Sequence, residues 1–187
     1  MLKREIRLIG IDDAPFNKFK KGDVLIVGTI FRGGSFLDGI LSTRVTIDGD
    51  DSTDRLVRMI NSSKFKSQIR CIILDGIALG GFNIIDIESL NTLTGVPVIV
   101  VVRREPNISK IISTLTKLGK LDKIRLIEKA GKPEKINKVY IQIRGTDLET
   151  ASEIMRMTCT RSNIPEPVRI AHIIASGIVR GESKGRA

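Results

Sequence analysis

Two apolar runs in the sequence each end on an aspartate: IGID ends at Asp12, and CIILD ends at Asp75. Carboxylate oxygens are the ligands that hard cations such as Mg²⁺ or Mn²⁺ prefer. Metal ions held by such carboxylates can activate a water molecule for attack on a phosphodiester. If the two runs are neighbouring parallel strands, Asp12 and Asp75 lie at one edge of a sheet and could bind a metal. An aspartate at a strand end can equally be a helix cap or a turn former.

A third metal ligand is expected among the acids that precede the first helix. Asp48, Asp50, Asp51 and Asp54 crowd this segment. One or two of them are expected to cap the helix, where a carboxylate satisfies free backbone amides. Asp51 and Asp54 are three residues apart and therefore share one helical face. We predict Asp51 as the third ligand, with Asp54 and Asp48 as the alternatives.

The apolar pattern predicts an α/β sheet of mixed direction that would position these acids. Strands are expected at 5–11, 23–31 and 39–47, and a turn at Gly33-Gly34 makes them an antiparallel meander. Apolar runs at 71–75, 96–102 and 139–143 are typical of buried parallel strands. Helices are expected after residue 53 and at 84–93, 108–118, 148–158 and 167–179, whereas 120–138 is basic and poorly periodic. This order predicts that the first strand lies beside the fourth.

Composition indicates one globular domain with a polyanionic partner. The chain has 187 residues, of which 41% are hydrophobic and 28% charged; we expect a single domain at 1–180 and a flexible tail at 181–187. The net charge of +10 favours nucleic acid or an anionic membrane surface as the partner. No apolar run approaches the roughly 20 residues of a membrane span. Cys71 and Cys159 lack metal-ligand spacing, so a cytoplasmic protein with reduced thiols is expected.

The glycines that follow Asp75 do not form a nucleotide-binding loop. Gly76, Gly80 and Gly81 match neither the G-x-G-x-x-G pattern nor the Walker pattern, and no Lys-Ser/Thr pair follows. Dinucleotide binding is therefore excluded as the main function. The glycines are expected to make a turn, or to let the backbone pass close to a ligand.

The only histidine, His172, falls in the last predicted helix. Apolar residues at 170, 173, 174 and 177 are expected to face the sheet. His172 lies about 200° around the helix from Ile170, so it leaves this stripe. A lone histidine in such a place is usually packed or solvated. Arg103, at the end of a strand, could likewise be a phosphate contact or a solvated strand end.

Several segments carry a resemblance to a known family. Residues 148–160 (LETASEIMRMTCT) and 163–172 (NIPEPVRIAH) are similar to the closing helix and the Leu-Pro-Glu-Pro-x-Arg-x-Ala-His/Asp signature of the endonuclease V family. Upstream, 9–12 (IGID), 74–78 (LDGIA) and 95–103 (GVPVIVVVR) resemble its first aspartate motif, its central Asp-Gly segment and its Pro-Thr-Ile-Gly-Val-Ala-Lys strand. The matches fall in chain order and cover most of 6–178.

This resemblance implies a ribonuclease H-like fold, with a mixed sheet of five to six strands flanked by helices. It also implies a Mg²⁺ site and cleavage of nucleic acid beside a deaminated base. Asp12 and Asp75 would then bind the metal. Arg103, at the position of the family's lysine, would stabilise phosphate charge. His172 would point toward Asp12 or Asp75.

The chain also departs from the endonuclease V pattern. The Tyr-x-Pro-Gly wedge has no counterpart in residues 46–53 (TIDGDDST), and the Arg-Glu pair that opens the first helix is missing. The His-Pro-Arg after the central Asp-Gly is replaced by Leu-Gly-Gly-Phe at 79–82. These departures favour a lesion other than inosine. They place the chain nearer to an archaeal family distantly related to endonuclease V.

The leading functional hypothesis is a metal-dependent nuclease, or a nuclease-like phosphodiesterase, that acts on DNA or RNA with Mg²⁺ or Mn²⁺. The rival is a non-catalytic nucleic-acid-binding module that retains the fold without turnover. A structural or regulatory protein without nucleic acid is the third class, and it leaves the charge of +10 unexplained.

Overall fold

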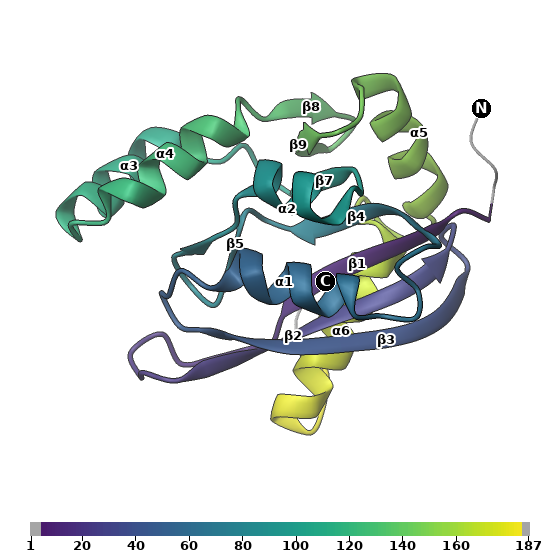
Figure 1. Cartoon of the computed structure of the whole chain (residues 1–187), viewed down its shortest axis with the longest axis horizontal. Coiled ribbons are helices and arrows are strands. Elements are labelled where there is room, and N and C mark those ends of the chain that lie inside the picture. Colours follow the sequence, from purple (N-terminus) through teal and green to yellow (C-terminus); the bar gives the residue numbers. More distant parts are fainter. Residues whose placement is uncertain (1–4, 185–187) are drawn as a thin grey trace.

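The computed structural model describes residues 5–184 and is built around one mixed seven-stranded sheet (Figure 1). The strand order is β3-β2-β1-β4-β7-β9-β8. The strands are β1 (Arg7–Asp13), β2 (Asp23–Arg32), β3 (Phe36–Thr46), β4 (Ile69–Asp75), β7 (Val98–Val102), β8 (Glu134–Ile136) and β9 (Val139–Arg144). A separate two-stranded sheet pairs β5 (Ala78–Leu79) with β6 (Asn83–Ile84).

The predicted meander and the central strand pairing are confirmed. β1, β2 and β3 are antiparallel neighbours, while β1, β4 and β7 run parallel. β1 is short and apolar and has partners on both sides, which explains why five of its seven residues are buried. The first and fourth strands therefore lie side by side, and their carboxyl ends share one edge of the sheet.

In the described residues, six helices pack around the sheet: α1 (Ser52–Asn61), α2 (Ile87–Thr94), α3 (Ile108–Lys117), α4 (Leu121–Ala130), α5 (Leu148–Thr158) and α6 (Glu166–Arg180). Figure 1 shows α1 and α2 in front of the sheet and α6 behind it, with α3 and α4 at one end. The described helices include none long and apolar enough to cross a membrane.

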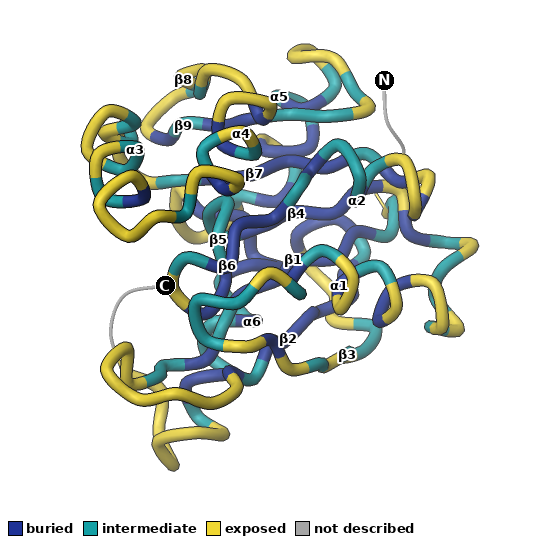
Figure 2. Tube along the Cα trace, turned by 60° about the vertical axis from the view of Figure 1, so that its left-hand side comes forward, coloured by how far each residue is buried: buried dark blue, intermediate teal, exposed yellow. Residues whose placement is uncertain are grey.

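The alternation of side chains along the strands builds a separate core on each face. Ile9 and Ile11 of β1 belong to one cluster, which also contains residues of α1 and α2. Leu8 of β1 and Ile73 of β4 belong to the other, which contains residues of α5 and the start of α6. The central strands are the most buried part of the trace (Figure 2).

Three sequence predictions need correction. Within residues 5–184 the sheet has seven strands rather than five or six. The strand predicted at 139–143 (β9) is antiparallel to β7 instead of parallel, and β8, which was not predicted, is antiparallel to β9. The poorly periodic segment 120–138 contains α4 and β8. Its helical pattern is obscured because the buried positions of α4 include Lys123, a residue type almost never found in a core.

The face of α6 that meets the sheet was also predicted wrongly. The buried residues of its central turns are Val168, Ala171 and Ala175, one position away from the isoleucine stripe. Small residues are needed here because the helix lies directly on the backbone of β1. The described part of the predicted flexible tail is 181–184, which follows the end of α6; 185–187 lie outside the described residues.

Candidate metal and nucleic-acid site

Strand alternation gathers the sequence-predicted acids at one edge and on one face of the sheet. Leu8, Gly10 and Asp12 share the face of β1 that α6 covers, and Asp75 occupies the same face of β4 two residues after Ile73. Ile11 pairs with Leu74 in the parallel register, so Asp12 and Asp75 come next on adjacent strands.

Arg103 and His172 complete this group. Arg103 follows β7, and its Nη1 lies 3.8 Å from Oδ2 of Asp75. The Nδ1 of His172, on α6, lies 2.8 Å from Oδ2 of Asp12. The imidazole therefore points at the acids, as the family resemblance implied. The other ring nitrogen of His172, Nε2, is buried and has no hydrogen-bond partner among the described residues.

Asp12 is a buried carboxylate with two other acids near it. Burial, helped by the negative charges of Asp75 and Asp13, raises the pKa of Asp12 to about 6, against the lowering effect of the hydrogen bond with His172. Asp12 is 4% exposed. A carboxylate kept from water beside two other acids is stabilised by a nearby cation.

Asp75 and His172 respond to the same field. Burial raises the pKa of Asp75, although the positive charges of Arg103 and His172 oppose the shift. The hydrogen bond with Asp12 raises the pKa of His172, and burial opposes it. The two acids and their two basic neighbours therefore form one coupled electrostatic unit.

The coupling can be measured directly, because the chain has a single histidine and its imidazole C2 proton gives one NMR resonance. We expect His172 to titrate above the ordinary pKa of 6.5. Asp12→Asn should bring the pKa down toward that value, since the carboxylate that stabilises the imidazolium is gone. Added Mg²⁺ should also lower it by repulsion. A titration curve that neither change alters would show that His172 and Asp12 are not in contact in solution.

Asp13 is a further acid beside this group that sequence reasoning did not single out. It lies on the opposite face of the end of β1, where its carboxylate accepts a hydrogen bond from the backbone N–H of Gly80 at 2.7 Å. Burial raises its pKa, the bond from Gly80 opposes this, and the charge of Asp75 raises it. The signal in the sequence was the pair Asp12-Asp13 at the end of β1. Successive strand residues point to opposite faces, so this pair places one carboxylate on each face of the sheet.

The structure does not bring Asp51 to this group. Its carboxylate accepts hydrogen bonds from Thr46, Asn83 and Arg55 at 2.8–3.2 Å. Burial would raise the pKa of Asp51, but these hydrogen bonds outweigh it and the pKa falls below the ordinary value. Asp51 therefore ties the start of α1 to the loop before it and to β6.

The two alternatives for the third ligand have other surroundings. Asp54 lies exposed on the first turn of α1. Asp48 has a left-handed backbone with φ of 53°, and its carboxylate accepts the N–H of Phe82 at 2.7 Å. The N–H of Asp48 donates to the carbonyl of Gly80 at 2.9 Å. The loop at 46–51 is thus interlocked with the loop at 80–82, which in turn holds Asp13.

A buried lysine of α4 fastens these two loops together. The Nζ of Lys123 donates to the carbonyl oxygens of Asp48, Gly49 and Phe82 at 3.1, 2.6 and 2.7 Å. It also lies 2.7 Å from a carboxylate oxygen of Asp50. The Lys123 side chain is only 3% exposed. One ammonium group therefore satisfies three backbone acceptors from two loops beside the acidic edge.

Lys123→Met should lower the free energy of unfolding by about 2 kcal/mol, because buried carbonyl oxygens lose a charged donor. Lys120→Met is the matched control, since Lys120 donates only to the carbonyl of Asp48; it should cost less than about 1 kcal/mol. Urea unfolding of both variants measures the difference. Equal losses in the two variants would contradict a special role for Lys123.

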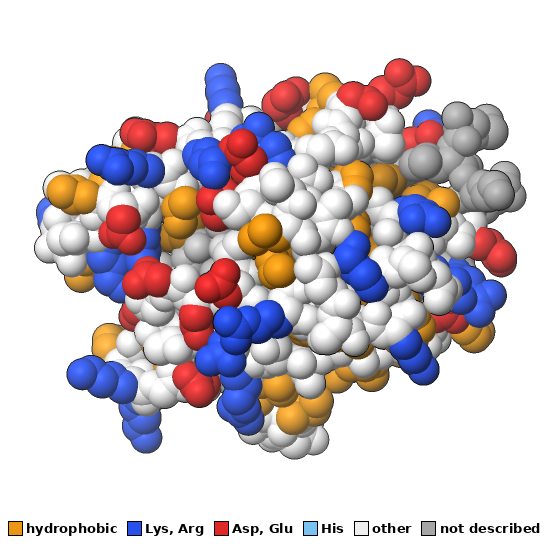
Figure 3. All heavy atoms as spheres, in the orientation of Figure 1, with side chains coloured by type: hydrophobic (Ala, Val, Ile, Leu, Met, Phe, Trp, Pro, Cys, Tyr) orange, Lys and Arg blue, Asp and Glu red, His pale blue; other side chains and the backbone are white. Residues whose placement is uncertain are grey.

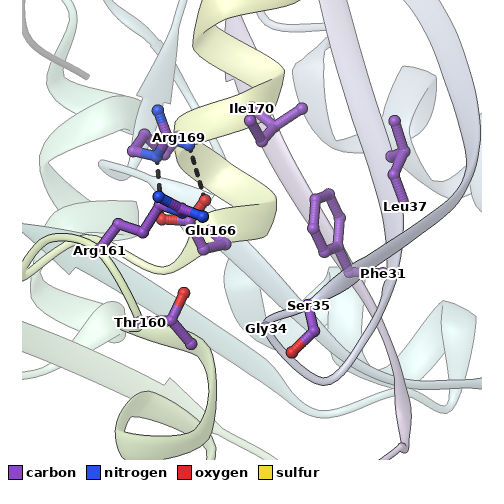
Figure 4. Close-up of a pocket in the computed structure, with 9 residues that line it drawn as sticks. All are labelled: Phe31, Gly34, Ser35, Leu37, Thr160, Arg161, Glu166, Arg169 and Ile170. Atoms are coloured by element: carbon purple, nitrogen blue, oxygen red, sulfur yellow. Dashed lines mark hydrogen bonds and ion pairs between the residues drawn. The ribbon is translucent and has the colours of Figure 1, made fainter.

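The signature at 165–172 also builds a pocket at the opposite edge of the sheet (Figure 4). Arg169 forms two hydrogen bonds to Glu166, at 2.7 and 2.9 Å, and the Glu166 carboxylate is nearly buried. Phe31, Ile170 and the turn at 34–35 line the other side of a cavity of about 570 Å³. The Glu and Arg of the signature thus fix the first turn of α6, away from the acids.

The donor set at the acidic edge fits Mg²⁺ or Mn²⁺. Among residues 5–184, no three or more His, Cys, Asp or Glu side chains come together in a way that could hold a metal ion by themselves. Mg²⁺ commonly binds one or two carboxylates and completes its shell with waters and substrate phosphates. Asp12 and Asp75 offer this partial shell in surroundings that favour a cation.

Comparison with known proteins places this geometry in a family. The family model described as Endonuclease dU matches residues 4–179. A UPF0215 protein from Methanothermobacter thermautotrophicus is 50% identical over 191 aligned residues, which cover all of this chain and 94% of that protein.

Solved structures show the same fold. A crystal structure of an Archaeoglobus fulgidus protein is 39% identical with a TM-score of 0.87, and the match covers 94% of this chain and 99% of the other. Endonuclease V of Ciona intestinalis, crystallised with a 24-mer DNA that contains an inosine followed by a ribo-adenosine, is 16% identical with a TM-score of 0.60, covering 95% and 87%. The fold is therefore endonuclease V-like, and the chain belongs to the Endonuclease dU family.

Proposed function

We propose that this protein is a metal-dependent endonuclease that cuts a nucleic-acid strand beside a deaminated base. The observation that carries the proposal is the cluster of Asp12, Asp75, Arg103 and His172 at the carboxyl edge of the central strands. The family name, Endonuclease dU, points to deoxyuridine as the base recognised. The DNA complex of the Ciona endonuclease V supports a nucleic-acid substrate.

Asp12 and Asp75 would hold Mg²⁺ or Mn²⁺. When bound, such an ion lowers the pKa of a water molecule and neutralises charge on a phosphate oxygen. The third ligand stays a prediction: Asp51 was favoured by sequence, whereas the acid that acts on Asp12 besides Asp75 is Asp13.

The remaining residues would orient the substrate and handle protons. Arg103 offers a guanidinium whose planar donors match phosphate oxygens. The hydrogen bond between Nδ1 and the Asp12 carboxylate fixes the ring of His172, and the buried Nε2 is the ring nitrogen that has no partner among the described residues. An imidazole with a pKa raised by its carboxylate partner can carry a proton near neutral pH.

The test is a cleavage assay on labelled oligonucleotides that contain one deoxyuridine, one deoxyinosine or neither, as single strands and as duplexes. We expect cleavage beside deoxyuridine that requires Mg²⁺ or Mn²⁺ and stops with EDTA. The net charge of +10 also suits a second candidate, a non-catalytic module that binds nucleic acid. Salt-dependent binding without cleavage on any substrate would establish that candidate instead.

A further inference from the structure

The β1–β2 loop, residues 14–22, begins directly after the acids of β1 and carries an exposed aromatic side chain. Phe19 is 87% exposed, more than any other large hydrophobic residue in the described part of the chain. Lys18, Lys20 and Lys21 surround it in sequence, and all three are exposed. In Figure 3 basic side chains project from the corner of the molecule where Figure 1 places this loop.

The loop has a defined shape that presents Phe19 outward. The Asn17 side-chain oxygen accepts the N–H of Phe19 at 3.0 Å, and the Asn17 carbonyl accepts the N–H of Lys20 at 3.0 Å. Phe16, three residues earlier, packs against the main core cluster. One phenylalanine therefore anchors the loop, and the other is held away from the protein on a turn.

Beside the loop lies a groove that is lined by both apolar and basic side chains. This groove of about 410 Å³ separates the loop from the end of α6, where Ile178 and Val179 are exposed. Lys20, Lys21 and Arg44 stand along the same groove. Positive charge beside an exposed aromatic ring matches a nucleic-acid strand, whose phosphates are anionic and whose bases have flat faces.

We propose that Phe19 stacks on an unpaired base of the nucleic-acid strand that the acidic edge binds, with the flanking lysines on its phosphates. The proposal rests on the proposed function, since it concerns the part of the bound strand that extends beyond the acidic edge. A single-stranded or locally opened strand is the ligand, because a base inside a duplex has no free face for the ring. Stacking tolerates any base, so the contact adds affinity without reading sequence.

Phe36 provides a matched control. It is also an exposed phenylalanine, at 59%, and Arg32 lies over its ring at 5.3 Å. Phe36 is the first residue of β3, at the other end of the sheet, where Arg32 of β2 lies opposite Arg7, the first residue of β1, in the strand register. An aromatic ring beside a cation is therefore present in both places, but only Phe19 lies in the loop that follows the acids of β1.

The experiment measures the Kd of a fluorescein-labelled, undamaged single-stranded 12-mer by anisotropy with Mg²⁺ present. Phe19→Ala should raise the Kd about tenfold, the effect of losing one stacked base. Phe19→Tyr should restore the wild-type value, and Phe36→Ala should leave it unchanged. Thermal unfolding checks that the variants fold. We expect no loss of stability in the Phe19 variants, because this side chain is 87% exposed.

A second readout separates stacking from charge. Lys21→Met should reduce the slope of log Kd against log salt by about 0.7, the value for one phosphate contact on a single strand, while Phe19→Ala should leave that slope intact. A 2-aminopurine base in the strand should lose fluorescence on binding to wild type and to Phe19→Tyr, but not to Phe19→Ala. Wild-type binding and cleavage with no change in Phe19→Ala would overturn the stacking proposal alone. A wild-type protein that binds no oligonucleotide would overturn the proposed function with it.

Discussion

Asp75→Asn should abolish metal-dependent cleavage while leaving the affinity for nucleic acid similar or higher. The amide is nearly the same size as the carboxylate, so the end of β4 should keep its structure. It cannot supply the negative charge that holds a divalent cation. We expect the cleavage rate to fall by more than about a hundredfold, the upper end of the range for residues that only support a metal ligand. Binding should not weaken, because a charge that repels phosphate has been removed.

The comparison with other acids makes this result specific. Asp54→Asn changes an exposed carboxylate on α1 and should leave cleavage unchanged. Asp51→Asn distinguishes the sequence prediction from the structural one. If Asp51 binds the metal, the variant should lose cleavage activity. If Asp51 only connects α1 to the loop before it, the variant should keep its activity and lose stability. Single-turnover cleavage and urea unfolding measure the two effects. Full activity of Asp75→Asn would remove the basis for the proposed function.

The parts of the site that sequence could predict are those set by strand ends. Asp12 and Asp75 each close a buried apolar run, and neighbouring parallel strands must bring such ends together. The direction of His172 followed from the resemblance. The apolar pattern alone predicted only that His172 lies outside the apolar stripe of the last helix. Periodicity does not show which partner a polar residue contacts.

The parts that sequence could not predict depend on competition among polar partners. Asp51, Asp48 and Asp13 are all acids beside loops, and only the folded structure shows which backbone N–H groups donate to each one. The helix α4 was missed because its most buried side chain is a lysine, stabilised by carbonyl oxygens from loops more than 40 residues away in sequence. Contacts of this kind do not produce a periodic pattern of apolar residues in the sequence.

Gly10 explains why the buried face of α6 differs from the isoleucine stripe. A Cβ atom at Gly10 would lie 2.2 Å from the carbonyl carbon of Pro167 and 2.4 Å from the nitrogen of Val168. Next to it on β2, the hydroxyl of Thr29 donates to the carbonyl of Pro167 at 2.6 Å. The first turn of α6 therefore rests on the backbone of the sheet, where large side chains have no room. A glycine inside a buried strand is the sequence signal for such an approach.

Gly10→Ala should accordingly destabilise the fold by about 3 kcal/mol, because overpacking here pushes against backbone atoms that cannot rotate away. For a chain of this size that loss corresponds to a fall in Tm of roughly 6–12 °C. Gly177→Ala is the control: Gly177 also lies in α6, a Cβ there meets nothing within 4 Å, and alanine should raise stability by up to about 1 kcal/mol. The displaced helix in Gly10→Ala should also move His172 away from Asp12, so the histidine pKa should fall toward its ordinary value in the NMR titration. Unchanged Tm and unchanged histidine titration in Gly10→Ala would show that α6 does not rest on β1 in this way, and that the placement of His172 has another cause.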